Sequence, residues 1–177
     1  MLVAHPEPAS DAAKRLFGQY GDEVYQYVRF TLGEATEAED VVQDVFLEVL
    51  RAWPRFRGLS SEKTWLWSIA RHRLIDHLRR LSRLGRDLSR RETGRDDPMA
   101  RDIATRVDVE CSLQYLPVAQ RQVVILRIIQ DHTTAEVSRM LGWPQVRVRV
   151  TLHRALKVLS SLLHDGEACV VKEGAHP

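Results

Sequence analysis

The segment TAEVSRMLGWPQVRVRVTLHRALKVL, residues 134–159, decides the fold of the second half of this chain. It predicts two helices joined by the turn Gly142-Trp143-Pro144, since apolar residues recur at helical spacing on both sides of that turn. Gly142 suits a left-handed helix end, and a short turn, often with glycine, joins the helices of a helix-turn-helix. The stripe expected to be buried in the second helix is Val148, Leu152, Ala155, Leu156 and Leu159.

The second helix of this unit is basic. Between Arg139 and Lys157 the sequence has five basic residues and no acidic one. A recognition helix places its early residues in the DNA major groove, where arginine can bond guanine or hold phosphate. Two packed helices with a basic surface remain the alternative, because many helical hairpins imitate this pattern. The residues expected to contact DNA are Arg147, Arg149, Val150, His153, Arg154 and Lys157.

The rest of the chain also predicts helices and no strand, so we expect an all-α fold. Apolar spacing of three and four predicts helices over 11–30 and 62–83, with a third between a cap at Thr36 and Pro54. The stretch 85–102 is rich in Arg, Asp and Ser and predicts a flexible linker. Two small helical domains, 11–84 and 103–164, are therefore expected. The helices predicted in the second are 103–115, 118–129, 134–141 and 145–163.

The helix after Thr36 has two contrasting faces. Thr36 and Glu39 match a capping box. Its apolar stripe is Val41, Val42, Val45, Phe46, Val49, Leu50 and Trp53. The opposite face carries Asp40, Gln43, Asp44, Leu47 and Glu48. After Pro54, Ser60 or Ser61 can cap the next helix, whose polar side is basic.

Charge is unevenly spread along the 177 residues. The net formal charge is +2, but residues 1–50 carry −7, residues 51–106 carry +8 and residues 107–177 carry +1. Basic tracts are the electrostatic footprint of a nucleic-acid partner, because phosphate contacts supply most of the affinity. A solvated arginine-rich surface is the alternative, and composition alone leaves the two nearly even.

Several classes of function and location are disfavoured. No apolar run is long enough for membrane insertion, and residues 1–10 lack the pattern of a secretory signal. Cys111 and Cys169 form no metal-binding spacing, and we expect free thiols and a cytoplasmic protein. His72 and Asp76 share a helix face but His77 does not, and the second ligand pair of a metalloenzyme is missing. We expect no enzyme activity, catalytic residue, metal or cofactor.

Two blocks of sequence together resemble the extracytoplasmic-function class of bacterial sigma factors. The first block is AEDVVQDVF (38–46), FRG (56–58), WLWSIA (65–70) and DHLRR (76–80). The second is LP (116–117), QR (120–121), EV (136–137), LG (141–142), Pro144 and HRA (153–155). The resemblance covers about residues 12–163 and implies sigma domain 2, a linker and sigma domain 4.

The resemblance also implies roles. Asp40, Gln43, Asp44, Leu47 and Glu48 would dock on the clamp helices of the largest subunit of core RNA polymerase, whose flap is a further contact. Domain 4 would read the −35 element of promoter DNA with the recognition helix. Domain 2 would read and melt the −10 element, with a loop from Arg57 to Lys63 taking a flipped base. The residues assigned to −10 contact are Phe56, Arg57, Ser60, Ser61, Lys63, Trp67, Arg71, His72, Arg79 and Arg80.

The chain departs from the family pattern at two places. His72 stands where the family usually has asparagine, and Val146-Arg-Val-Arg-Val-Thr151 replaces the usual Gly-Thr-Val-Lys-Ser-Arg. The promoter preference of relatives therefore does not transfer. Free chains of this class are expected to be monomers, and an anti-sigma factor is a common partner whose existence the sequence leaves open.

Two other functions remain alternatives. A helix-turn-helix regulator would bind duplex operators as a dimer without polymerase, but it has no need of the first block. A polymerase-binding decoy would bind polymerase and open no promoter.

Overall fold

The computed structural model describes residues 7–84 and 104–164, and every regular element in these ranges is helical. The elements are α1 (Ala9–Leu32), α2 (Ala35–Ala52), the 3-10 turn η1 (Trp53–Arg55), α3 (Glu62–Arg83), α4 (Ala104–Gln114), α5 (Val118–Val124), the π-helical η2 (Ile125–Ile129), α6 (Thr134–Leu141) and α7 (Gln145–His164). The all-α prediction is confirmed for these residues. None of these helices combines the length and apolar character that crossing a membrane requires.

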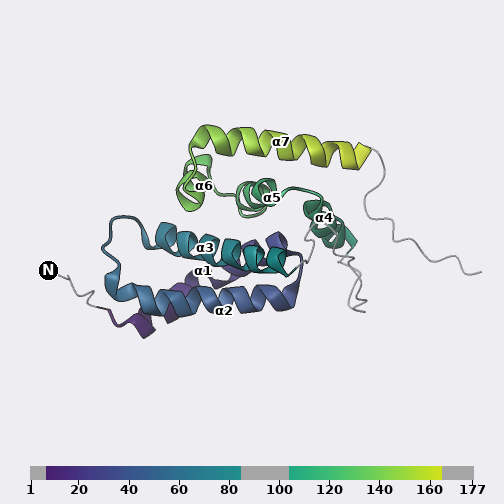
Figure 1. The fold of residues 1–177 in the computed structure, drawn as a ribbon. Helices are drawn as coiled ribbons and strands as arrows, with labels where there is room; N and C mark the ends of the chain where they lie inside the picture. The colour runs from purple at the N-terminus through teal and green to yellow at the C-terminus, as the bar shows by residue number, and fades with distance from the viewer. Residues whose placement is uncertain (1–6, 85–103, 165–177) are drawn as a thin grey trace, which may run out of the picture.

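Helices α1–α3 pack as one layer, with α2 and α3 running along α1 (Figure 1). The valines of the α2 stripe are buried as expected, but Leu50 is 37% exposed. The predicted capping box at Thr36 is wrong: the N-cap is Glu34, two residues earlier, α2 begins at Ala35, and Glu34 makes no side-chain cap. Ser61 does cap α3, since its hydroxyl accepts a hydrogen bond from the Thr64 amide at 3.1 Å.

The helix-turn-helix is α6 and α7. A capping box does exist here, between Thr133 and Glu136, and the hydrogen bonds that Thr133 donates lower the pKa of the Glu136 carboxyl. Gly142 ends α6 with φ 63°, as predicted. Ser138 donates a hydrogen bond to the Trp143 carbonyl at 2.5 Å, which fixes the turn. In α7 the buried stripe includes Val148 and Ala155, whereas Leu156 is 44% exposed.

The two groups of helices share one hydrophobic core. At the junction the buried Arg121 guanidinium donates hydrogen bonds to four backbone carbonyls, those of Thr31, Leu113, Gln114 and Leu116. The C-terminal carbonyls of a helix lack intrahelical partners and carry partial negative charge. One cation therefore caps the ends of both α1 and α4. Desolvation lowers the pKa of Arg121 to about 10, so it stays charged at neutral pH.

Further contacts join α1 to the second group. Gln114 donates a hydrogen bond to the Phe30 carbonyl at 3.1 Å. An added Cβ at Gly33, whose φ is +80°, would lie only 2.7 Å from the Gln114 side chain. Gln130 bonds the Glu23 carbonyl at 2.6 Å. The end of α1 is thus fitted closely to α4, and its middle contacts the residue that follows η2.

The structure bears on the predicted free thiols but not on the predicted linker. Cys111 is disulfide-bonded, so the prediction of free thiols is wrong for this residue. The predicted linker, 85–102, lies outside the described residues. The domain limits 11–84 and 103–164 stay predictions, since residues 103 and 85–102 are not described.

Candidate nucleic-acid and partner-binding surfaces

The basic side of α7 is open to solvent. All six residues predicted to contact DNA, 147, 149, 150, 153, 154 and 157, are exposed. Helix α7 lies on the side of the molecule away from α1–α3 (Figure 1). Arg147 stacks over the Trp143 ring at 4.0 Å, so the turn orients this guanidinium. Arginine can donate two hydrogen bonds at once to a phosphate group or to the edge of a base. The exposed basic side of α7 therefore fits duplex DNA.

A groove of about 280 Å³ lies between the start of α5 and α7. Pro117 and Gln120 line one side, and Arg147, Val150 and Arg154 line the other. Val150 stands beside two arginines here, which places an apolar contact next to charge-assisted donors. This combination can meet a thymine methyl beside a phosphate or guanine.

The polar face of α2 is partly neutralised by α3. Asp40 and Gln43 are exposed, and Leu47 is 41% exposed. Glu48 pairs with Arg73 at 2.5 Å, and Asp44 pairs with Arg80 at 3.6 Å. The face predicted to dock polymerase therefore touches a residue predicted to contact −10 DNA, Arg80.

An apolar groove of about 470 Å³ runs beside this face, between α1 and α2. Phe17, Phe46 and Leu50 line it together with Leu47. Phe17 is 56% exposed and meets Phe46 edge-to-face at 5.0 Å. Leu50 was predicted to lie in the core, and no role was predicted for Phe17. An exposed phenylalanine on the outer side of α1 was the signal that could have found this groove.

The loop between η1 and α3 projects from the α1–α3 layer. Residues 57–61 are all exposed, with Leu59 at 89%, and Gly58 has φ +65°. At its base Phe56 stacks on Trp53 at 5.4 Å and tilts against Trp65 at 4.9 Å. A solvent-exposed loop next to a cluster of aromatic side chains is suited to binding a flipped nucleobase.

Two aromatic residues predicted to contact the −10 element are buried. Phe56 is 9% exposed and belongs to the cluster of aromatic side chains beneath the loop. Trp67 is 1% exposed and packs edge-to-face on Tyr27 at 5.1 Å and on His132 at 5.8 Å. The prediction that Trp67 stacks on a base does not fit this arrangement, because tertiary packing covers its ring on both sides.

The basic residues predicted on α3 fall into two groups. His72, Arg79 and Arg80 are exposed, although Arg79 pairs with Asp76 at 3.3 Å. Lys63 and Arg71 are half-buried: the Lys63 ammonium pairs with Glu23 at 3.0 Å and lies 5.2 Å from the Tyr20 ring. Helix α6 packs against α3, so part of the predicted −10 surface faces the second group of helices.

The histidine pair considered for a metal site does not converge. His77 contacts Glu37 at 3.2 Å, and His72 lies exposed on the same helix. Among residues 7–84 and 104–164, no three His, Cys, Asp or Glu side chains are grouped to hold a metal ion.

His132 occupies the contact between α3 and the second group of helices. It is 6% exposed, and its Nε2 lies 3.6 Å from the Glu23 carboxylate. Burial, with a smaller contribution from Lys63, lowers the pKa of His132, while Glu23, Glu136 and Asp131 oppose that shift. The residue is therefore neutral in the packed state at pH 7.

Acidification is expected to weaken this packing. Because the folded pKa lies below the ordinary 6.5, the unfolded chain binds the proton first, so stability present above pH 6.5 is lost as pH falls through the folded pKa. Urea unfolding at pH 7.5 and 5.5 should show a decrease of at most about 1.4 kcal/mol per pH unit from this group. His132→Gln should show a smaller decrease, and an unchanged pH dependence in that variant would contradict the assignment.

Arg121, Gln114 and His132 were given no role by the sequence analysis, although Arg121 lies inside a quoted motif. The available signal was a single arginine within an apolar run, since a buried arginine must find several acceptors. Its partners could not be inferred, because they are backbone carbonyls of two other helices.

Comparisons with known proteins identify both halves. The Sigma-70 region 2 model matches residues 16–84, and the model of Sigma-70, region 4 matches residues 106–159. The chain is 31% identical to the ECF RNA polymerase sigma factor SigX of Bacillus subtilis, over 81% of this chain and 79% of that one.

Two solved structures are also similar. CnrH, in complex with the cytosolic domain of CnrY, has 25% identity and a TM-score of 0.66, covering 88% of this chain and 90% of that chain. The sigma factor RpoE of Bartonella quintana, in complex with the anti-sigma factor NepR, has 22% identity and a TM-score of 0.70, covering 85% and 96%. The second likeness concerns the fold alone.

Proposed function

Since this chain belongs to the extracytoplasmic-function class of RNA polymerase sigma factors, we propose that α1–α3 bind core polymerase and the −10 element, and that α4–α7 bind the −35 element. The chain is a sigma factor, which directs RNA polymerase to promoters. That work is divided among separate surfaces of the chain. The observation that carries the division is that a solvent-exposed basic α7 and an acidic α2 face lie on different helical layers.

The α2 face and the adjoining α1–α2 groove form the proposed polymerase-docking surface. Asp40, Gln43 and Asp44 supply polar and acidic contacts, and Leu47 with Phe17 supplies apolar area. Such a mixture fits a basic helix with an apolar strip, as in the clamp helices expected from the family. Charge complementarity would speed association, and burial of the apolar residues would hold the complex.

The exposed loop 57–61 with His72, Arg79 and Arg80 forms the proposed −10 surface. Phe56 supports this surface from below, and Trp67 is left out of it because it is buried. Lys63 and Arg71 are half-buried, and Lys63 is paired with Glu23, so neither is as open to a nucleic acid as the loop, His72, Arg79 and Arg80 are.

We further propose a non-enzymatic cytoplasmic protein that can be held by an anti-sigma factor. Transcription initiation takes place on chromosomal DNA, which is the reason for proposing the cytoplasm. The surfaces described above are proposed to bind partners and not to catalyse a reaction. The RpoE fold is bound by an anti-sigma factor, and such a partner would compete for the α2 face.

Run-off transcription with core polymerase, with and without this chain, tests the proposed function. Start sites that appear only with the chain support it, and their upstream sequences define the −10 and −35 elements. A chain that binds duplex DNA but not core polymerase would favour the operator-binding regulator. A chain that binds core but opens no promoter would favour the decoy.

Arg149→Ala is expected to weaken binding of the full chain to a −35 duplex by on the order of tenfold, because one good arginine–base contact contributes about 1–3 kcal/mol. Binding to core polymerase should not change, since α7 lies away from the α2 face (Figure 1). Fluorescence anisotropy with duplex and with labelled core measures both. Arg139→Ala, on exposed α6, is the control. An equal loss of both kinds of binding would contradict the role.

A further inference from the structure

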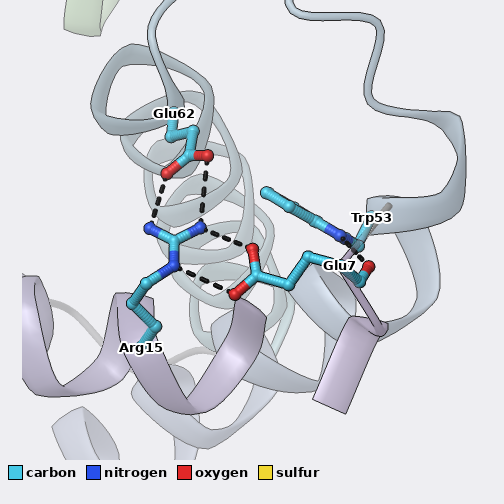
Figure 2. A network of polar contacts seen from close by, with 4 residues as sticks. All are labelled: Glu7, Arg15, Trp53 and Glu62. Carbon is cyan, nitrogen blue, oxygen red and sulfur yellow. Dashed lines mark hydrogen bonds and ion pairs between the residues drawn. The ribbon is translucent and has the colours of Figure 1, made fainter. Parts of the chain in front are cut away.

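Arg15 links three parts of the α1–α3 layer through two forked ion pairs (Figure 2). To Glu62 its Nη1 and Nη2 donate hydrogen bonds of 2.7 and 3.2 Å. To Glu7 its Nε and Nη2 donate bonds of 3.1 and 2.8 Å. These hydrogen bonds raise the pKa of Arg15. Bidentate pairs fix direction as well as distance, so the two carboxylates are held in defined places.

Both ends of the exposed loop 57–61 connect to this network. At the far end, Glu62 is the first residue of α3 and follows the capping Ser61 directly. At the near end, the Trp53 indole donates a hydrogen bond to the Glu7 carbonyl at 3.0 Å (Figure 2). Trp53 also stacks on Phe56. The Arg15 guanidinium also lies 5.9 Å from the Trp53 ring.

The network is too exposed to be a main source of stability. The Arg15, Glu7 and Glu62 side chains are each about one third exposed, at 35%, 29% and 35%. Ion pairs at such positions add little to the free energy of unfolding. Their geometric effect is different, because they hold Glu62, at the far end of loop 57–61, and Glu7, whose carbonyl accepts the hydrogen bond of Trp53 near the other end.

We propose that Arg15 is a positioning residue for the −10 loop: with Glu7 and Glu62 it fixes both ends of residues 57–61, so that the loop is preorganised to receive a melted promoter base. A loop already held in its binding conformation loses less entropy on binding than a free one. This inference rests on the proposed function of the loop. It gives the segment before α1, through Glu7, a part in promoter opening.

The test compares wild type with Arg15→Gln, which keeps hydrogen-bonding capacity but removes the charge and the fork. Holoenzyme opening of a promoter found by run-off transcription is followed by 2-aminopurine fluorescence in the −10 element. Arg15→Gln should slow opening roughly five- to tenfold and reduce discrimination between the native and a substituted −10 base. Binding to core and to the −35 duplex should be unchanged.

Two variants check that the effect is specific. Glu62→Gln should reproduce the loss, and the double variant should be little worse than either single one, as expected for groups acting through one contact. Arg29→Gln is the matched control, because Arg29 is also on α1 and pairs with a carboxylate of another helix, Glu110, at 3.0 Å. It should open the promoter as wild type does.

A second readout needs no polymerase. Tryptic cleavage after Arg57 in the free chain should be several times faster in Arg15→Gln than in wild type or Arg29→Gln, because the loop is released. Unchanged opening, base discrimination and cleavage in Arg15→Gln would overturn the positioning role alone. A wild-type chain that gives no run-off transcript would instead overturn the proposed function and this inference together.

Discussion

Arg121→Met is expected to lower the free energy of unfolding by about 3–5 kcal/mol. The Arg121 guanidinium is 4% exposed and donates to the carbonyls of Thr31, Leu113, Gln114 and Leu116. Methionine fills similar space without a donor. The variant would leave four acceptors at a buried junction without their partner, and unpaired buried polar groups are costly.

The position of these carbonyls makes the effect larger than that of an ordinary hydrogen bond. Thr31 is in the last turn of α1, and Leu113 and Gln114 end α4. The guanidinium therefore also balances the negative ends of two helix dipoles. Arg121→Lys should recover only part of the loss, since an ammonium has three donors and cannot reproduce the planar fork.

Urea unfolding followed by far-UV circular dichroism measures the change. Arg139→Met is the control, because Arg139 is exposed on α6, and substitutions at such sites usually change stability by within about 0.5 kcal/mol. A loss below about 1 kcal/mol for Arg121→Met would show that water satisfies the carbonyls equally well. The packing of α1 against α4 and α5 would then have to depend on the shared apolar core.

Local sequence signals predicted the helices well. The start of α3, the end of α6 and the start of α7 follow from a serine cap, a left-handed glycine and a proline, each acting within a few residues. The Thr36 cap failed because α2 starts at Ala35. A capping pattern fixes the helix start only when the preceding chain leaves that hydroxyl at the N-cap position.

Long-range contacts were beyond the sequence pattern. Trp67 was expected to contact DNA from the family resemblance, yet it is covered by Tyr27 and His132 from two other segments. Asp44 and Glu48 were expected as a free acidic face, yet each meets an arginine of α3. The spacing of polar and apolar residues along one helix identifies its outer face. It does not show which neighbouring helix partly covers that face.

Asp44→Arg is expected to weaken binding to core polymerase by on the order of 100-fold, because like charges placed opposite each other at an interface cost several kcal/mol. Asp44 has a side chain that is 47% exposed and sits beside Gln43 and Leu47 on the proposed docking surface. Its only close cation among the described residues, Arg80 at 3.6 Å, is itself 58% exposed. That pair is weak enough for a basic partner to replace. Asp44→Ala should have a smaller effect, about tenfold, since it removes attraction without adding repulsion.

The matched control for this variant is Asp76→Arg. Asp76 is 53% exposed and pairs with an arginine of α3 at 3.3 Å, so the same change of charge is made in a similar local setting on α3 instead of α2. Anisotropy with labelled core polymerase, at two salt concentrations, measures the binding. Asp44→Arg should lose most affinity at low salt, where surface charges are least screened, whereas Asp76→Arg should bind core as wild type does.

Unfolding and −35 duplex binding separate docking from damage to the fold. Asp44 is too exposed for its replacement to change the free energy of unfolding much. Helix α7 lies on the side of the molecule away from α1–α3, so −35 duplex binding should not change either (Figure 1). Loss of core binding with normal unfolding and normal duplex binding can arise only at the α2 face. If Asp44→Arg and Asp76→Arg bind core polymerase equally well, the polymerase contacts another surface. The next substitutions should then be made in the apolar groove between α1 and α2, beginning with Phe17.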